Sequence, residues 1–267
     1  MRVRAITGFF FIIVMLASVL INAAVFTGFY LILSAFCLHE FYKLVKQSGT
    51  QPNISAGLIN GVFIFALFAA QAYLSGYKLL LLLPVTLSAI FIQELFKKAT
   101  APFNNIAYSY LGLIFTIIPF TFFHALAFVS GSFNFHLPLG FLLLLWANDT
   151  GAYLVGSKLG RVKLFERHSP KKTWEGFIGG ILITAGVALI LGHYYGEYSW
   201  KQWVSVGILI STFGTMGDLV ESMFKRSINV KDSGGILPGH GGLLDRFDGL
   251  LLAAPIVYAY LYFISNA

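Results

Sequence analysis

Charged side chains are scarce in this sequence, since Asp, Glu, Lys and Arg make up 11% of its 267 residues. Soluble domains carry roughly 25% charged residues, which they need to cover a surface that faces water. Hydrophobic residues account for 57% of the chain. This composition excludes an ordinary soluble domain, a disordered chain and a basic DNA-binding domain, so we expect no nucleic-acid partner. We expect an all-α, polytopic integral membrane protein.

Cysteine is almost absent, and several familiar catalytic motifs are missing. The single thiol, Cys37, lies in an apolar run, so it can form neither an intrachain disulfide nor a zinc cluster. The sequence has no HExxH motif, no G-x-x-x-x-G-K-[ST] phosphate loop and no Ser-His-Asp arrangement with a nucleophile elbow. These absences exclude several hydrolase and NTPase classes.

Long hydrophobic runs are the main positive feature. About 20 apolar residues cross the hydrocarbon as a helix, and nine segments qualify: 5–21, 23–41, 55–75, 78–96, 106–129, 138–158, 176–195, 202–224 and 243–264. The first of these follows a basic N-terminus but has no clear small-residue cleavage site, so we interpret it as an uncleaved span. Almost nothing separates it from the second, which predicts a tight helical hairpin near Asn22.

Lysine and arginine fall on one side of these nine spans. If the spans alternate in direction, all of the 18 basic residues except Lys78 and Lys201 lie at the same membrane face. The positive-inside rule makes that face cytoplasmic, so the N-terminus is expected inside and the C-terminus outside. We divide the chain into N-terminal membrane helices (1–135, about five spans) and a C-terminal catalytic region (136–267, about four spans).

Acidic residues are few, and some fall within the predicted spans. Asp149 lies near the middle of the sixth span, Asp218 in the cytoplasmic third of the eighth, and Asp245 and Asp248 at the start of the ninth. An ionisable group in a bilayer is costly and marks a functional site by default, although an ion pair between helices is the alternative. At 100° per residue, one stripe of the eighth span carries four polar residues: Asp218, Glu221, Ser222 and Lys225.

Carboxylates that converge beside many basic residues are typical of chemistry on phosphates. Mg²⁺ binds one or two carboxylates together with substrate phosphates, and Lys and Arg bind phosphate oxygens. Glycine lets backbone N–H groups approach a phosphate. The pattern therefore predicts Mg²⁺-dependent phosphoryl or nucleotidyl transfer.

The segment between the eighth and ninth spans carries the most specific motif. Ser222–Asp248 reads SMFKRSINVKDSGGILPGHGGLLDRFD, and it contains S-x-x-K-R, K-D, H-G-G and D-R-x-D. It resembles the signature of the CTP:phosphatidate cytidylyltransferase (CDP-diacylglycerol synthase) family. Two weaker stretches, Asn148–Gly160 and Ser169–Gly180, also resemble that family. The resemblance covers roughly the C-terminal half, from Asn148 onward.

The resemblance implies transfer of the cytidylyl group of CTP to phosphatidate, and we assign roles on that basis. The expected principal metal ligands are Asp218 and Asp245, with Asp248 and Asp149 as further ligands. The residues expected to neutralise phosphates are Lys225, Arg226, Lys231 and Arg246. The residues expected to contact substrate are Ser169, Lys171, Lys172, Thr173, Glu175, Ser222, His240, Gly241 and Gly242. Gly176 is expected to open the next helix. Alternatively, Asp149 holds Lys172, Asp248 orients Arg246, and the glycines of 156–180 serve helix packing.

Two other functions are compatible with acids inside membrane spans. A secondary transporter would use Asp149 and Asp218 for ion coupling, but the charged motifs are confined to the cytoplasmic side. A CTP-dependent lipid kinase would need a base for its hydroxyl substrate, and the long signature argues against it. Membrane lipid is an expected partner, and a bacterial inner membrane the expected location. A second, monovalent cation and a homodimer are left open.

Overall fold

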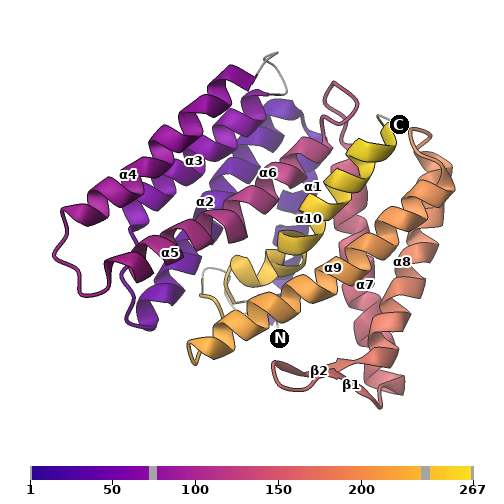
Figure 1. Cartoon of the computed structure of the whole chain (residues 1–267). Coiled ribbons are helices and arrows are strands. Elements are labelled where there is room, and N and C mark those ends of the chain that lie inside the picture. The colour runs from indigo at the N-terminus through magenta and orange to yellow at the C-terminus, as the bar shows by residue number, and fades with distance from the viewer. Residues whose placement is uncertain (1, 72–76, 236–240, 266–267) are drawn as a thin grey trace.

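The computed structural model describes residues 2–71, 77–235 and 241–265, which form helices and one small hairpin (Figure 1). The helices are α1 (Arg2–Leu20), α2 (Ala23–Gln47), α3 (Ile54–Ala70), η1 (Tyr77–Leu82), α4 (Leu83–Leu95), α5 (Pro102–Gly112), η2 (Leu113–Ile117), α6 (Ile118–Leu126), α7 (His136–Leu159), α8 (Trp174–Tyr194), α9 (Trp200–Ser227) and α10 (Leu244–Ser265). The strands are β1 (Lys163–Phe165) and β2 (Ser169–Thr173).

Six of the described helices are long and apolar enough to cross a membrane: α2, the continuous α5–α6 rod, α7, α8, α9 and α10. Three shorter apolar helices span Ile6–Leu20, Ile54–Ala70 and Leu79–Leu95. The multi-pass, helical character expected from composition is therefore confirmed. Each of the nine expected segments coincides with one of these helices, and the number of crossings stays a prediction.

Local signals explain where several helices begin and how closely they pack. The expected turn near Asn22 is present, because the Asn22 side chain accepts a hydrogen bond from the Val25 N–H (2.9 Å) and caps α2. Helices α7 and α8 approach through glycines, since a Cβ on Gly176 would lie 3.1 Å from the Cα of Gly156. The expected packing role of these glycines is confirmed.

The small hairpin β1–β2 is an addition to the helical fold that the sequence did not predict. These strands pair antiparallel in the connection between α7 and α8, where the sequence predicted only a loop. Helix α8 begins at Trp174 rather than at Gly176. Its N-cap is Thr173, whose Oγ1 accepts a hydrogen bond from the Gly176 N–H (3.2 Å). The predicted opening of the helix at Gly176 was therefore wrong by two residues, and Gly176 instead lies against α7.

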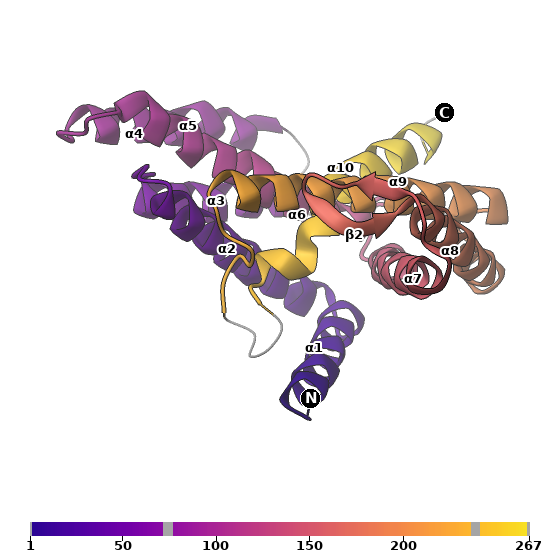
Figure 2. The same cartoon turned by 90° about the horizontal axis from the view of Figure 1, so that it is seen from below.

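The termini mark opposite ends of the molecule. The start of α1 and the hairpin lie at one end, and the end of α10 lies at the other (Figure 1). Seen from below, the hairpin lies beneath α7, α8 and α9, while α2–α5 form the opposite side (Figure 2). Helix α10 packs against α9, α6 and α2. The buried apolar residues of both halves form one core. The expected division of the chain near residue 135 falls in the connection between α6 and α7.

Candidate functional site

The basic hairpin contacts the acidic stripe of α9. The Lys172 Nζ lies 2.6 Å from Oδ2 of Asp218, and the Ser222 hydroxyl donates a hydrogen bond to Oδ1 of the same carboxylate (3.2 Å). The side chains of Lys172 and Asp218 are 27% and 35% exposed. The carboxylate that holds Lys172 is therefore Asp218, whereas the sequence suggested Asp149, and the pair remains open to a ligand.

A cavity of about 450 Å³, here called the hairpin cavity, lies between the hairpin and helices α7, α8 and α9. Its polar lining combines acids and bases on three elements: Asn148, Asp149, Lys171, Lys172, Thr173 and Asp218. Tyr153 and Phe177 add aromatic surface. The cavity thus holds two lysines that can face an anion and two carboxylates that can face a cation.

A second cavity of about 450 Å³, here called the α1 cavity, lies where α1 approaches α7, α9 and α10. Helix α1 contributes Thr7, Gly8, Phe11 and Ile12. The other helices contribute Trp146, Asp149, Gly214, Asp218, Asp245, Arg246, Asp248 and Gly249. Asp149 and Asp218 line both cavities, so these two carboxylates lie where the cavities meet.

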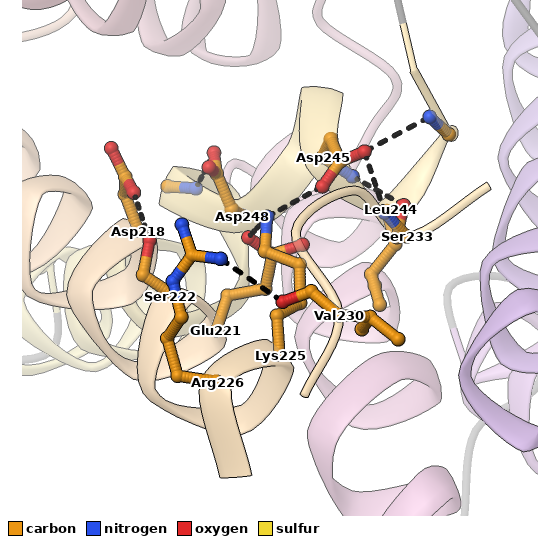
Figure 3. A network of polar contacts seen from close by, with 12 residues as sticks. Asp218, Glu221, Ser222, Lys225, Arg226, Val230, Ser233, Leu244, Asp245 and Asp248 are labelled. Carbon is orange, nitrogen blue, oxygen red and sulfur yellow. Dashed lines mark hydrogen bonds and ion pairs between the residues drawn. The ribbon is translucent and has the colours of Figure 1, made fainter. Parts of the chain in front are cut away.

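Lys225 of α9 pairs with one carboxylate of its own helix, Glu221, and with one of α10, Asp245 (Figure 3). Its Nζ lies 2.6 Å from Oε2 of Glu221 and 2.6 Å from Oδ1 of Asp245. The side chains of Lys225, Glu221 and Asp245 are 11%, 0% and 9% exposed. An ammonium has three donors, and these two carboxylates account for two of them.

Asp245 also organises the segment that precedes α10. Its Oδ2 accepts hydrogen bonds from the N–H groups of Ser233 and Gly242 (2.9 Å each), and its own N–H donates to the Ser233 hydroxyl (3.3 Å). With Lys225, three of the roughly four acceptor positions of the carboxylate are occupied. Asp245 thus fixes the loop, and one position remains for the predicted metal.

The other expected site residues occupy different environments. Asp248 lines the α1 cavity, and its Oδ1 accepts a hydrogen bond from the Gly249 N–H (2.6 Å). The exposed Arg226 donates to the Val230 carbonyl (3.2 Å), and Lys231 is exposed in the following loop. Ser169 opens β2.

Glu175 and the glycines at 241 and 242, which were expected to contact substrate, stabilise or form the connections between elements. Glu175 accepts hydrogen bonds from the N–H groups of Arg161 (3.0 Å) and Val162 (3.2 Å), so its carboxylate closes the hairpin. Gly241 has φ = +83°, a conformation that favours glycine, and a Cβ on Gly242 would lie 2.1 Å from the Ser233 hydroxyl. Both glycines therefore occupy positions where a side chain would not fit. The first residue of the expected turn, His240, lies outside the described residues.

Comparison with known proteins identifies the family. The sequence profile described as "Cytidylyltransferase family" matches residues 2–264. A phosphatidate cytidylyltransferase of Staphylococcus aureus (strain COL) is 34% identical over 262 residues, which cover 96% of this chain and 97% of that protein. One of Bacillus subtilis (strain 168) is 32% identical over 281 residues, which cover 99% of each chain. The chain belongs to the cytidylyltransferase family.

Membership of the cytidylyltransferase family confirms the resemblance and makes this chain a nucleotidyltransferase. The match also corrects the expected extent of the resemblance, because it includes the N-terminal helices as well as the region from Asn148 onward. The transporter and lipid-kinase alternatives have no support from these relatives.

The donors at the meeting point of the two cavities fit a magnesium ion. Within the described part of the chain, no group of three or more His, Cys, Asp or Glu side chains could by itself hold a metal. Mg²⁺, however, usually takes one or two carboxylates and completes its shell with water and substrate phosphates. Asp149 and Asp218 supply such a pair, and Asp248 lies in the wall of the α1 cavity.

Two buried acids were not assigned to the site from the sequence. Glu221 was placed on the polar stripe but given no role, although it is fully buried beside Lys225. Glu40 was overlooked, although it lies within the predicted span 23–41 and is one of only 11 acids. Its Oε2 accepts a hydrogen bond from the Leu244 N–H (2.9 Å). An acid within a hydrophobic run was the signal that could have found it.

Proposed function

We propose that this chain transfers the cytidylyl group of CTP to phosphatidate, giving CDP-diacylglycerol and pyrophosphate at the cytoplasmic face of a bacterial inner membrane. The relatives in Staphylococcus aureus and Bacillus subtilis are named phosphatidate cytidylyltransferases, which supports the reaction. The observation that carries the proposal is that Asp149 and Asp218 line two cavities. One of these also holds two lysines, and the other combines a face of α1 with Arg246 and two further aspartates.

The reaction needs charge neutralisation more than it needs a nucleophilic side chain. A phosphate oxygen of phosphatidate attacks the α-phosphorus of CTP, a new P–O bond forms, and the bond to the pyrophosphate leaving group breaks. Because the attacking group is already an anion, no covalent residue or general base is required. The enzyme must instead bring two anions together in line.

The two cavities suit the two substrates. The hairpin cavity opens beside Lys171 and Lys172, which would bind the phosphates of CTP, and Tyr153 and Phe177 provide surface for the base. The α1 cavity combines Phe11, Ile12 and Trp146 with Arg246, so it offers apolar walls for an acyl chain and a cation for a lipid phosphate. Lys225 has one donor left for either phosphate.

Magnesium, held by Asp218 with Asp149 or Asp248, would neutralise phosphate charge and align the attacking and leaving oxygens. Around it, Lys172 holds the Asp218 carboxylate, and Ser222 fixes its rotamer through a hydrogen bond. Lys225 and Asp245 hold the ends of α9 and α10 together. The family resemblance implies that further groups bind the phosphates, namely Arg226, Lys231 and the backbone at Gly241 and Gly242.

The reaction is tested directly with purified protein, labelled CTP, phosphatidate vesicles and Mg²⁺. We expect CDP-diacylglycerol and pyrophosphate in equal amounts, no product when EDTA replaces Mg²⁺, and none when diacylglycerol replaces phosphatidate. Addition of K⁺ to the same assay tests a second cation, and the mass of the protein in detergent tests a homodimer. Absence of product from folded protein would reject the proposed reaction.

The proposed orientation predicts that the hairpin faces the cytoplasm. The native Cys37 is fully buried, and Lys171 is exposed, so Lys171→Cys supplies an accessible thiol. In oriented inner-membrane vesicles, an impermeant maleimide should label this variant only when the cytoplasmic face is outside. The matched variant Ser132→Cys, at the other end of the bundle, should show the opposite pattern. Labelling of Lys171→Cys from the external face alone would overturn the topology.

A further inference from the structure

Three consecutive residues of α2 connect the N-terminal helices to different parts of the molecule. Glu40 accepts a hydrogen bond from the Leu244 N–H, 204 positions away (2.9 Å). The Phe41 ring stacks on Phe224 of α9, with centroids 4.8 Å apart and planes at 16°. Tyr42 donates to the Ser109 carbonyl (2.6 Å). Successive helical residues point about 100° apart, so α2 can contact α10, α9 and α5 at one level.

The Glu40 carboxylate lies against the backbone of the segment between α9 and α10, at Gly234 and Gly242. The residue is only 3% exposed. A Cβ on Gly234 would lie 2.6 Å from its Oε1, and one on Gly242 would lie 2.7 Å from its Oε2. Both glycines therefore leave the room that the carboxylate occupies. A buried carboxylate is costly unless it is hydrogen-bonded, and the hydrogen bond from the Leu244 N–H offsets part of that cost.

The hydrogen bond from Leu244 lies at the N-terminus of α10. Leu244 is the first residue of α10, and the first N–H groups of a helix have no partner within it. A carboxylate is favourable there because of the helix dipole. The next residue is Asp245, which binds Lys225 and the N–H groups of Ser233 and Gly242. Glu40 thus fixes the start of the helix that carries Asp245.

We infer that Glu40 is a positioning residue for the transfer reaction: it holds the start of α10 so that Asp245 and Lys225 keep their geometry beside the α1 cavity. This inference rests on the proposed function, because it assigns Glu40 to that site. It also gives the N-terminal half a part in the reaction, although none of the basic residues expected at the phosphates comes from that half.

The test compares Glu40→Met with Glu40→Gln and with a matched control. Met keeps the size of the side chain but removes the acceptor, whereas Gln retains a carbonyl oxygen for the Leu244 N–H. Glu94→Met is the control, since Glu94 is 2% exposed on α4 and is bound by Asn105 and Lys97, away from α10. Activity and thermal unfolding are measured for all three variants.

We expect Glu40→Met to lower kcat about tenfold or more, with a smaller change in KM for CTP, because misplaced catalytic groups lower the rate rather than binding alone. Glu40→Gln should retain activity within about threefold of the parent protein. Glu94→Met should unfold at a lower temperature and yet keep kcat within about twofold, since its contacts lie outside the site. A decrease in kcat that is equal for Glu40→Met and Glu94→Met would overturn the inference.

A second measurement does not depend on turnover. Hydrogen exchange of the 241–249 peptide should become about tenfold faster in Glu40→Met, because the Leu244 N–H loses its acceptor and the start of α10 opens locally. Exchange there should be unchanged in Glu94→Met. Unchanged protection in Glu40→Met would refute the positioning role. If the parent protein makes no CDP-diacylglycerol but this exchange increases, the proposed reaction fails while the structural contact stands.

Discussion

Asp218→Asn is expected to lower kcat on the order of 10³-fold while the protein still folds. The substitution keeps the size of the side chain and an oxygen that can accept the Ser222 hydrogen bond. It removes the negative charge where the two cavities meet, and it removes the partner of Lys172. Both the proposed magnesium ion and the basic hairpin then lose the group that holds them at the reacting phosphates.

The dependence on magnesium separates this explanation from general damage. In Asp218→Asn, the residual activity should require a higher Mg²⁺ concentration for half-maximal rate, and thermal unfolding without Mg²⁺ should change little because Asp218 is partly exposed. A variant with the parent kcat and the parent Mg²⁺ requirement would show that Asp218 is not a metal ligand.

Glu197→Gln provides the matched loss of one negative charge. Glu197 lies between α8 and α9 at the opposite end of the molecule, where Asn134 donates to it (2.9 Å) and His136 contacts it. Burial alone would raise the pKa of Glu197. The hydrogen bonds from Asn134 and His136 together outweigh that effect, so the pKa lies below its usual value. The side chain is charged at pH 7. We expect kcat within about twofold of the parent, because a charge this distant is screened.

The local sequence pattern was sufficient to locate the helices and to predict which polar residues of α9 are neighbours. A period of 3.6 residues placed Asp218 beside Ser222 and Glu221 beside Lys225, and these contacts are present. Hydrophobic runs of about 20 residues located the helices because a bilayer requires such runs. The hairpin was missed because β2 is rich in lysine and has no apolar alternation, so no strand signal exists in SPKKT.

Long-range contacts could not be deduced from the same pattern. Glu40 and Leu244 are 204 positions apart, and neither residue identifies the other in the sequence. The pairing of Lys172 with Asp218 rather than Asp149 depends on where the hairpin crosses beneath α9, which is a property of the tertiary structure. The family signature brought these segments into one hypothesis, whereas the packing of α1, α2 and α10 determines how the cavities are bounded.

Lys225→Met is expected to impair both stability and reaction. The ammonium lies 2.6 Å from each of two carboxylates, and its loss leaves Glu221 and Asp245 facing one another with little solvent. Removal of one partner from a buried ion pair costs about 3–5 kcal/mol, because the remaining charge is uncompensated. The free energy of unfolding in detergent should fall by that amount, and CDP-diacylglycerol formation should fall below detection.

The control for Lys225 is Lys97→Met. Lys97 also pairs with a buried glutamate, Glu94 (3.1 Å), but its side chain is 43% exposed, and Asn105 still donates to Oε1 of that carboxylate. Its loss should cost about 1 kcal/mol or less, because solvent screens an exposed lysine. We expect this variant to keep the parent activity.

A double substitution distinguishes the two effects of Lys225. In Lys225→Met with Glu221→Gln, the uncompensated charge of Glu221 is removed, and most of the lost stability should return. Activity should stay absent if Lys225 supplies its remaining donor to a substrate phosphate, since neither Met nor Gln can replace that cation. Recovery of activity together with stability would mean that Lys225 only balances buried acids, and the phosphate contact would then have to come from Arg246 and the hairpin lysines alone.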